Sequence, residues 1–386
     1  MSPTRIHGFD LARALAIIGM MTSHLGPSQD WVGALSNGFP SALFAVLAGV
    51  SLSLMHAKAD ATGGPELAAT RHRTLIRGVI LVALGMVLSS VQSVIAVVLA
   101  SIGAIYLVLG PCTRWRTRYL VAGAVILPLV GIGLSFYQVQ GTPMAQSPLL
   151  EGAYPIINWL AYGIFGMVLH RAFFAKPLIP VAVTCLGLLV GGYAVWQRHL
   201  TGEMGHGENP LDVVYSYGFS AGVIGLCLLI TRPRALTTAL YPLRSLGVMA
   251  LTVYVAHVLT AAIPLQGYPS FGSESSSAAA YGESMDELFA GVDFEQFRED
   301  IAATENWEEY MAVESETLFP AAGSGAAGSD SDALPTEQDH TAWWLGSIGV
   351  ALVLCSLWRA FRPRGPLEAA LRWATYRGST PELAAR

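Results

Sequence analysis

The chain has 386 residues, of which 53% are hydrophobic and 13% are charged, and its mean hydropathy is +0.49. Soluble globular domains carry about 25% charged residues, so this composition excludes an ordinary soluble fold and indicates a membrane protein. The formal net charge of −5 hides a segregation, because 17 of the 27 Asp and Glu residues lie between Glu274 and Asp339. The basic residues occur in short clusters between apolar runs and not along one face, so no nucleic-acid partner is expected.

Apolar runs of about 20 residues recur along nearly the whole chain, and each is long enough to cross a hydrocarbon core of about 30 Å. They predict an all-α, polytopic transmembrane bundle of about ten helices. Residues 1–265 and 341–386 would form this single membrane domain. The ten predicted spans lie at residues 9–26, 38–56, 75–90, 92–110, 119–137, 153–174, 178–197, 211–231, 243–264 and 342–361.

The first predicted helix is the least suited to face lipid, because it contains Asp10, Arg13 and His24. Ionisable groups inside a span are costly and are candidates for function, so we expect this helix inside the bundle. Asp10 and Arg13 are three residues apart and can pair on one helical face. His24 lies on nearly the same face, about 21 Å farther along the axis. The alternative is that the pair caps the helix at one interface while His24 snorkels at the other.

The sixth predicted helix carries a polar stripe. Asn158 and Tyr162 follow Tyr154 at intervals of four residues, with Trp159 beside them. Asn158, Trp159 and Tyr162 are therefore candidate substrate-binding residues, since an indole ring can stack on a sugar. The alternative is an interfacial aromatic belt, which is the better interpretation of Tyr154.

Two more histidines are candidates for the outer half of the bundle. His257 lies inside the ninth predicted helix, where it is either a catalytic imidazole or a core histidine bonded to a hydroxyl group. His206 and Asn209 precede the eighth helix, where they either bind substrate or form an ordinary polar loop and helix cap. The sequence contains no phosphate-binding Gly-x-x-x-x-Gly-Lys loop and no His-Glu-x-x-His, and the four cysteines are far apart, so no metal site is expected.

The basic residues predict the topology. Of the 22 Lys and Arg residues, 20 fall in alternate polar breaks or at the near end of the first helix, and only Arg198 and Arg298 fall opposite. The positive-inside rule then places both termini in the cytoplasm, with the protein in the plasma membrane. Three of these arginines, Arg73, Arg77 and Arg244, are candidate phosphate contacts, although topology alone can explain them.

The segment 266–340 separates the last two predicted helices and is far longer than an ordinary loop. This acidic stretch is expected to be an extracytoplasmic insert, partly disordered. Residues 284–287 have the spacing of a capping box before a short amphipathic helix, and residues 321–331 resemble a flexible linker.

Several segments resemble a known group of membrane enzymes. The pattern Arg5-Ile-x-Gly8-x-Asp10-Leu-Ala-Arg13, ending at His24, is similar to the opening motif of transmembrane acyltransferases related to heparan-α-glucosaminide N-acetyltransferase. Residues 41–51, 154–166 and 242–254 and the run Gly365-Pro-Leu-Glu368 are similar to an uncharacterised bacterial branch of that superfamily. Two departures are Ala14, where the motif has Gly, and the absence of histidine from residues 25–37.

The resemblance implies acyl transfer, with acetyl-CoA or another acyl-CoA bound from the cytoplasm as donor. The acceptor would be a sugar or lipid-linked glycan at the outer face, and no metal would be needed. His24 would act as base or transient acyl carrier, Asp10 and Arg13 would organise the donor channel, and His257 would shape the acceptor side. The alternatives are a proton-coupled secondary transporter, since buried Arg and His also suit a carrier, and a non-catalytic scaffold.

Overall fold

The computed structural model describes residues 6–27, 30–90, 95–139, 154–175, 178–201, 210–261, 263 and 340–377. These residues are 89% helical and include no strand, which confirms the all-α prediction. Six helices are long and apolar enough to cross a membrane, or seven if the bent pair α11 and α12 counts as one span. The protein thus has the character of a multi-pass membrane protein, while the count of ten crossings and the side of the termini remain predictions.

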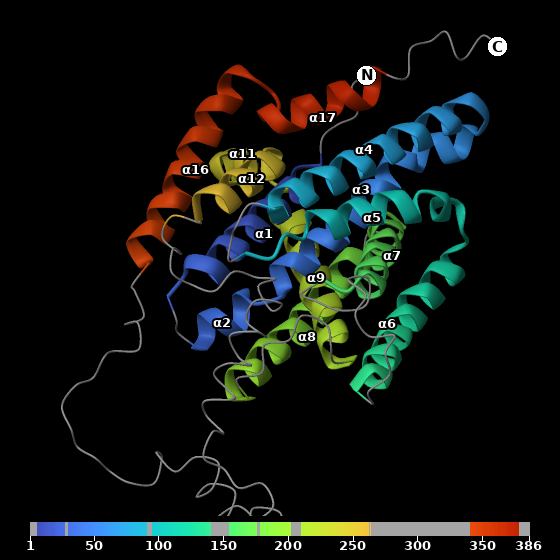
Figure 1. The fold of residues 1–386 in the computed structure, drawn as a ribbon, viewed down its shortest axis with the longest axis horizontal. Helices are drawn as coiled ribbons and strands as arrows, with labels where there is room; N and C mark the ends of the chain where they lie inside the picture. The colour runs from blue at the N-terminus through green and yellow to red at the C-terminus, as the bar shows by residue number, and fades with distance from the viewer. Residues whose placement is uncertain are drawn as a thin grey trace, which may run out of the picture. The chain divides into compact units, whose positions relative to one another are not determined.

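Each predicted span overlaps a described helix, and three short helices and a 3₁₀ turn (η1) occur in addition (Figure 1). Almost all of the predicted 266–340 insert lies outside the described residues, as do its capping box and linker. The bounds are α1 (His7–Leu25), α2 (Asp30–Ser36), α3 (Phe39–Thr62), α4 (Gly64–Ser90), α5 (Leu99–Leu109), η1 (Pro111–Arg114), α6 (Thr117–Val139), α7 (Ile156–Phe173), α8 (Ile179–Thr201), α9 (Pro210–Ile230), α10 (Arg234–Ala239), α11 (Tyr241–Val248), α12 (Ala250–Ala261), α16 (Thr341–Phe361) and α17 (Pro366–Arg377).

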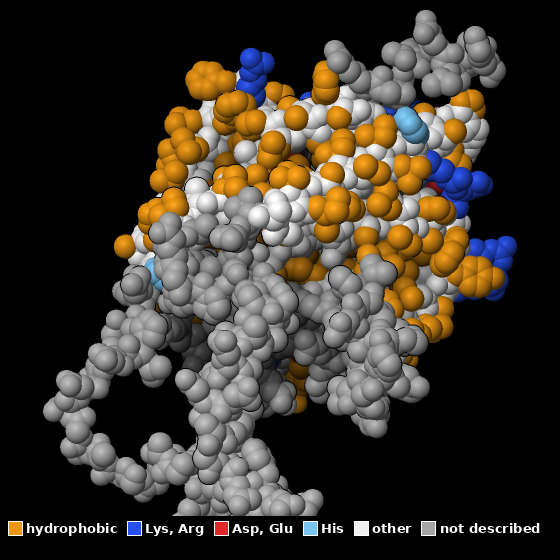
Figure 2. All heavy atoms as spheres, viewed as in Figure 1, with side chains coloured by type: hydrophobic (Ala, Val, Ile, Leu, Met, Phe, Trp, Pro, Cys, Tyr) orange, Lys and Arg blue, Asp and Glu red, His pale blue; other side chains and the backbone are white. Residues whose placement is uncertain are grey.

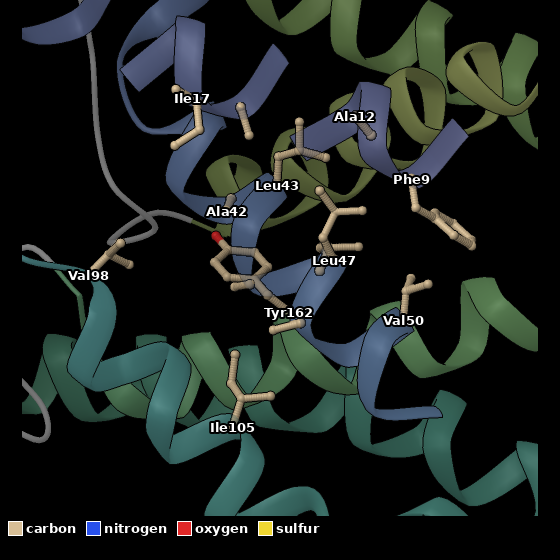
Figure 3. Close-up of a cluster of buried hydrophobic side chains, with 14 of the residues drawn as sticks. Phe9, Ala12, Ile17, Ala42, Leu43, Leu47, Val50, Val98, Ile105 and Tyr162 are labelled. Carbon is tan, nitrogen blue, oxygen red and sulfur yellow. The ribbon is translucent and has the colours of Figure 1, made fainter. Parts of the chain in front are cut away.

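The polar helix α1 lies inside the bundle, as its composition predicts. It contacts α2, α3, α9, α11, α12 and α16. Its apolar side chains, such as Phe9 and Ile17, enter the buried cluster together with Leu43 and Leu47 of α3 (Figure 3). Contacts on several sides keep the charged groups of α1 away from lipid. The interior of a bundle is where such groups are tolerated in a membrane protein.

Close helix pairs in the bundle are built on glycine. At the crossing of α3 and α7, a methyl group added to Gly49 would overlap the carbonyl oxygen of Gly163. Between α8 and α9, Gly187 and Gly222 lie backbone to backbone in the same way. Small residues let helices approach closely in lipid, where no hydrophobic effect drives them together. The glycines therefore explain why α8 and α9 form the most extensive helix pair among the described residues.

Large apolar side chains that are exposed cover the outside of α4, α6, α8 and α16. Figure 2 shows such side chains spread over the described part of one face, with Lys and Arg at its margin. An apolar exterior of this extent fits contact with lipid tails. Examples are Val79, Ile126, Leu189 and Leu354.

Two predicted spans differ from continuous crossings. The span at 243–264 is a broken helix, in which α11 and α12 meet at an angle of 79° around Met249. The span at 92–110 contains α5, whose 11 residues rise only about 16 Å, roughly half of the hydrocarbon core. Val98, just before α5, donates its backbone N–H to the Tyr254 hydroxyl of α12 at 3.1 Å. The two short helices therefore meet inside the bundle.

Candidate functional site

A cavity of about 490 Å³ lies among α1, α3, α4, α5, the α11–α12 break and α17. Its most distinctive feature is charge. Among the described residues, five arginines line it, and Glu368 is the only acidic side chain in its wall. Since like charges repel, a cavity with this lining favours an anionic ligand. The five arginines are Arg13, Arg73, Arg77, Arg364 and Arg372.

Two of the predicted phosphate contacts, Arg73 and Arg77, line this cavity together. They are four residues apart on α4, so both project from one face of the helix. The Arg73 guanidinium lies 4.5 Å from the ring centroid of Tyr376, and the Arg77 guanidinium lies 5.1 Å from that of Tyr106. The Nε of Arg77 is buried and has no hydrogen-bond partner among the described residues. Both arginine side chains thus lie against aromatic rings, and both face the same cavity.

The third predicted phosphate contact, Arg244, does not line the cavity. Its guanidinium donates a hydrogen bond to the Thr237 carbonyl oxygen at 2.5 Å and lies 2.5 Å from Nδ1 of His7. The side chain is buried against the start of α1. Its contacts are those of a residue that joins α11 to the chain's first helix.

Asp10 and Arg13 form the predicted ion pair, with 3.2 Å between Arg13 Nη1 and Asp10 Oδ1. Asp10 is buried, while Arg13 also donates to the Ser51 hydroxyl of α3 at 2.9 Å. Arg13 and Ser51 both line the cavity. The pair therefore presents one of the five cationic groups to the cavity and anchors it to two helices.

The cavity wall also contains apolar side chains. They include Leu47, Leu81, Leu99 and Ile102, together with the ring of Tyr254. A wall that combines arginines with apolar side chains matches a ligand that has an anionic head and an uncharged arm.

The two histidines singled out in the sequence meet next to this wall. Nε2 of His257 lies 3.4 Å from Nδ1 of His24, and the ring centroids are 5.5 Å apart. His257 is buried. It follows Tyr254 by three residues on α12, a rise of about 4.5 Å. One turn of helix therefore separates the cavity wall from an imidazole pair. Among the described residues, no group of three or more His, Cys, Asp and Glu side chains could hold a metal ion.

The predicted substrate-binding residues are placed differently. Asn158, Trp159 and Tyr162 are 2%, 1% and 1% exposed, and none lines the cavity. The rings of Trp159 and Tyr162 pack edge to face with centroids 5.2 Å apart, and Figure 3 shows Tyr162 among buried side chains of α3 and α5. The structure thus places this stripe in the core and leaves no open ring face for a sugar. His206 and Asn209 lie outside the described residues.

A carboxylate that the sequence analysis did not single out holds the start of α12. Glu368 of α17 accepts hydrogen bonds from the backbone N–H groups of Leu251 and Thr252 at 2.8 and 3.2 Å and from the Thr252 hydroxyl at 2.6 Å. The run Gly365-Pro-Leu-Glu368 is part of the family resemblance, which gives Glu368 no role. The sequence signal for a specific role of Glu368 is its position as an acidic residue among the arginines of the C-terminal segment.

The expectation that the chain has no nucleophile elbow can be tested on one segment of α9. Gly218-Phe-Ser220-Ala-Gly222 has the spacing of a Gly-x-Ser-x-Gly nucleophile elbow. It lies within the uninterrupted helix α9, whereas an elbow stands on a strand-to-helix turn. Both glycines pack against α8, and the buried Ser220 hydroxyl has no hydrogen-bond partner among the described residues. The pattern is a packing motif and not a nucleophile.

No protein-family model matches the chain, and no curated protein matches it significantly. The family resemblance of residues 5–24 and 365–368 therefore stays a prediction. Function has to be inferred from the geometry of the cavity and the histidine pair.

Proposed function

We propose that this protein is an integral membrane acyltransferase that uses acyl-CoA as donor and a sugar or lipid-linked acceptor at the outer face. One observation carries the proposal. The arginine-lined cavity reaches Tyr254, and one turn farther along α12 His257 contacts His24. The short helix α12 thus carries both Tyr254 of the cavity wall and His257, one member of the imidazole pair.

The lining matches the parts of acyl-CoA. Its phosphate groups are anions, and planar guanidinium groups bind phosphate with paired, charge-assisted hydrogen bonds. Its adenine ring can stack beside the exposed ring of Tyr376, which already lies next to the Arg73 guanidinium. The uncharged pantetheine arm and the acyl group suit the apolar side chains of the wall, which include Leu47, Leu99 and Ile102.

The imidazole pair can supply the chemistry. In direct transfer, the oxygen or nitrogen atom of the acceptor attacks the thioester carbonyl, and a neutral imidazole accepts the proton of this hydroxyl or amine. The carbon–sulfur bond then breaks, and CoA leaves as a thiolate that takes up a proton. Alternatively, His24 accepts the acyl group as an acyl-imidazole and passes it to the acceptor in a second step.

The direction of transfer follows from the basic residues. Arg73, Arg364 and Arg372 of the cavity belong to clusters that the positive-inside rule assigns to the cytoplasm. Acyl-CoA is then bound from the cytoplasmic side. His24 is eleven residues beyond Arg13 on α1, about 16 Å toward the opposite side. The acyl group would be handed over near the outer half of the bundle, with both termini in the cytoplasm of a plasma membrane.

Acetyl-CoA turnover in proteoliposomes tests this function. The purified protein should release free CoA, detected by mass spectrometry, and transfer the acetyl group to an amino-sugar or glycolipid acceptor. A protein in which Arg118 is replaced by alanine provides a control, because this exposed arginine lies outside the cavity. Absence of both CoA binding and CoA release from the wild-type protein would reject the proposal.

A proton-coupled carrier is the second candidate, and the broken helix favours it. Transporters of this class place substrate at helix breaks near the membrane centre, and α11 and α12 break at 79° beside the cavity. The pair of the half-buried His24 and the buried His257 could then bind the coupling proton. Counterflow of a phosphorylated solute without CoA release would favour the carrier over the enzyme.

A further inference from the structure

The hydrogen bonds of Glu368 join two elements that are far apart in the sequence. Its carboxylate binds the backbone N–H groups of Leu251 and Thr252 and the hydroxyl of Thr252. Thr252 Oγ1 in turn accepts the backbone N–H of Leu367 at 3.2 Å. The first turns of α17 and α12 are therefore joined by hydrogen bonds in both directions, since each helix donates to the other.

The start of α12 needs such a partner. The break at Met249 interrupts the helical hydrogen-bond pattern, and the first N–H groups of a helix have no partner within it. An anion near these N–H groups is also favoured by the helix dipole. Of the described residues that line the cavity, Glu368 is the only acidic one, and it satisfies two of these donors.

The anchored helix is short and carries the proposed chemistry. α12 has 12 residues. Tyr254 lies two residues after Thr252, and His257 lies five residues after it. Any rotation of the first turn of α12 is therefore passed on to both side chains. α17 contacts α12 in space, although their residues are more than 100 positions apart in the chain.

We infer that Glu368 is a positioning residue for the proposed reaction, which fixes the first turn of α12 so that Tyr254 faces the cavity and His257 meets His24. This inference rests on the proposed function for its catalytic meaning, whereas the anchoring itself is a property of the fold. Glu368 does not bind the donor. It lies among arginines that bind the anion, so its own charge opposes donor binding.

The change in CoA affinity separates a positioning role from a general structural role. Glu368→Gln removes the negative charge of Glu368 from the cavity wall, so the affinity for CoA should stay the same or rise. Turnover should fall about tenfold or more, and a tenfold fall corresponds to about 1.4 kcal/mol of lost transition-state stabilisation. A variant that simply damages the fold would lose affinity and turnover together.

Hydrogen exchange measures the anchoring without reference to activity. In Glu368→Gln the amides of residues 250–257 should exchange about tenfold faster, while those of α8 and α9 stay protected. Thr252→Val should give a smaller increase in exchange in the same segment. Thr252→Ser should exchange like the wild-type protein, because it keeps the hydroxyl group. Glu66→Gln is the matched control, since Glu66 is an exposed carboxylate that pairs with Lys58 at 3.2 Å away from the cavity.

Two results would overturn the inference. The first is unchanged exchange of residues 250–257 in Glu368→Gln. The second is a parallel loss of CoA affinity and turnover, with faster exchange throughout the protein. If the wild-type protein shows no acyl transfer, the proposed function fails, and the exchange measurement alone still decides whether Glu368 holds α12.

Discussion

Replacing Arg77 by alanine removes a cationic side chain from the wall of the cavity while leaving the helix intact. Arg77 is half-buried, its guanidinium lies 5.1 Å from the ring centroid of Tyr106, and its Nε has no hydrogen-bond partner among the described residues. Alanine is a strong helix former, so α4 should persist. The substitution therefore tests donor binding with little effect on folding.

The expected loss of affinity follows from the kind of contact. A hydrogen bond to a charged group contributes about 1.5–3 kcal/mol. At about 1.4 kcal/mol for each factor of ten, Arg77→Ala should raise the dissociation constant for CoA roughly 10- to 150-fold. Arg77→Lys keeps the charge but loses the planar, forked donor set. Its dissociation constant for CoA should therefore lie between that of the wild-type protein and that of Arg77→Ala.

Isothermal titration in nanodiscs measures these constants directly. S-acetylpantetheine is the matched ligand, because it has the thioester arm but no phosphate group, and its affinity should not change in Arg77→Ala. Arg118→Ala is the matched protein, since Arg118 is an exposed arginine outside the cavity. Equal losses for CoA and S-acetylpantetheine, or no loss for either, would refute the assignment of the cavity to the phosphates of the donor.

His24→Ala should lower acyl-CoA turnover by about 10²–10⁴-fold and leave the dissociation constant for CoA nearly unchanged, because it removes an imidazole and no phosphate contact. His24→Asn should be as inactive, and full turnover in either variant would move the catalytic role to His257. Arg198→Ala should cost about 3 kcal/mol of stability, because it removes the buried partner that lies 3.0 Å from the half-buried Asp212 carboxylate. Thermal unfolding in detergent should show recovery when Asp212→Asn is added, and independent, additive losses would contradict the pairing. In a cysteine-free background, Ser147→Cys should react with an impermeant thiol reagent on intact cells and Thr117→Cys should not, and the reverse would overturn the predicted topology.

Much of the fold and part of the site were predictable because they depend on local sequence. Apolar runs predicted the positions of the helices, and the charges of α1 predicted its burial inside the bundle. The Asp10–Arg13 pair follows from a spacing of three residues, and the shared face of Arg73 and Arg77 follows from a spacing of four. In each case helix geometry alone brings the side chains together.

The remaining features depend on contacts between distant segments. His24 and His257 are 233 residues apart, and Glu368 is 117 residues from Leu251, so no local pattern indicates that they meet. The break at Met249 is also hidden, because residues 243–264 contain no internal proline before Pro264 and read as one apolar run. The polar stripe of α7 was attributed to a substrate site because composition does not distinguish a polar group facing a cavity from one packed in the core.

The glycine contacts between helices bear on how this chain can change during evolution. A lipid-facing position such as Leu189 accepts almost any apolar residue, so its identity can drift freely. Gly187 and Gly222 tolerate no side chain, because each lies against the backbone of the other helix. Gly247 is similarly restricted by the backbone carbonyl of Asp10. Distant relatives should therefore be recognised by the spacing of these glycines and of Glu368, and not by overall hydrophobic similarity.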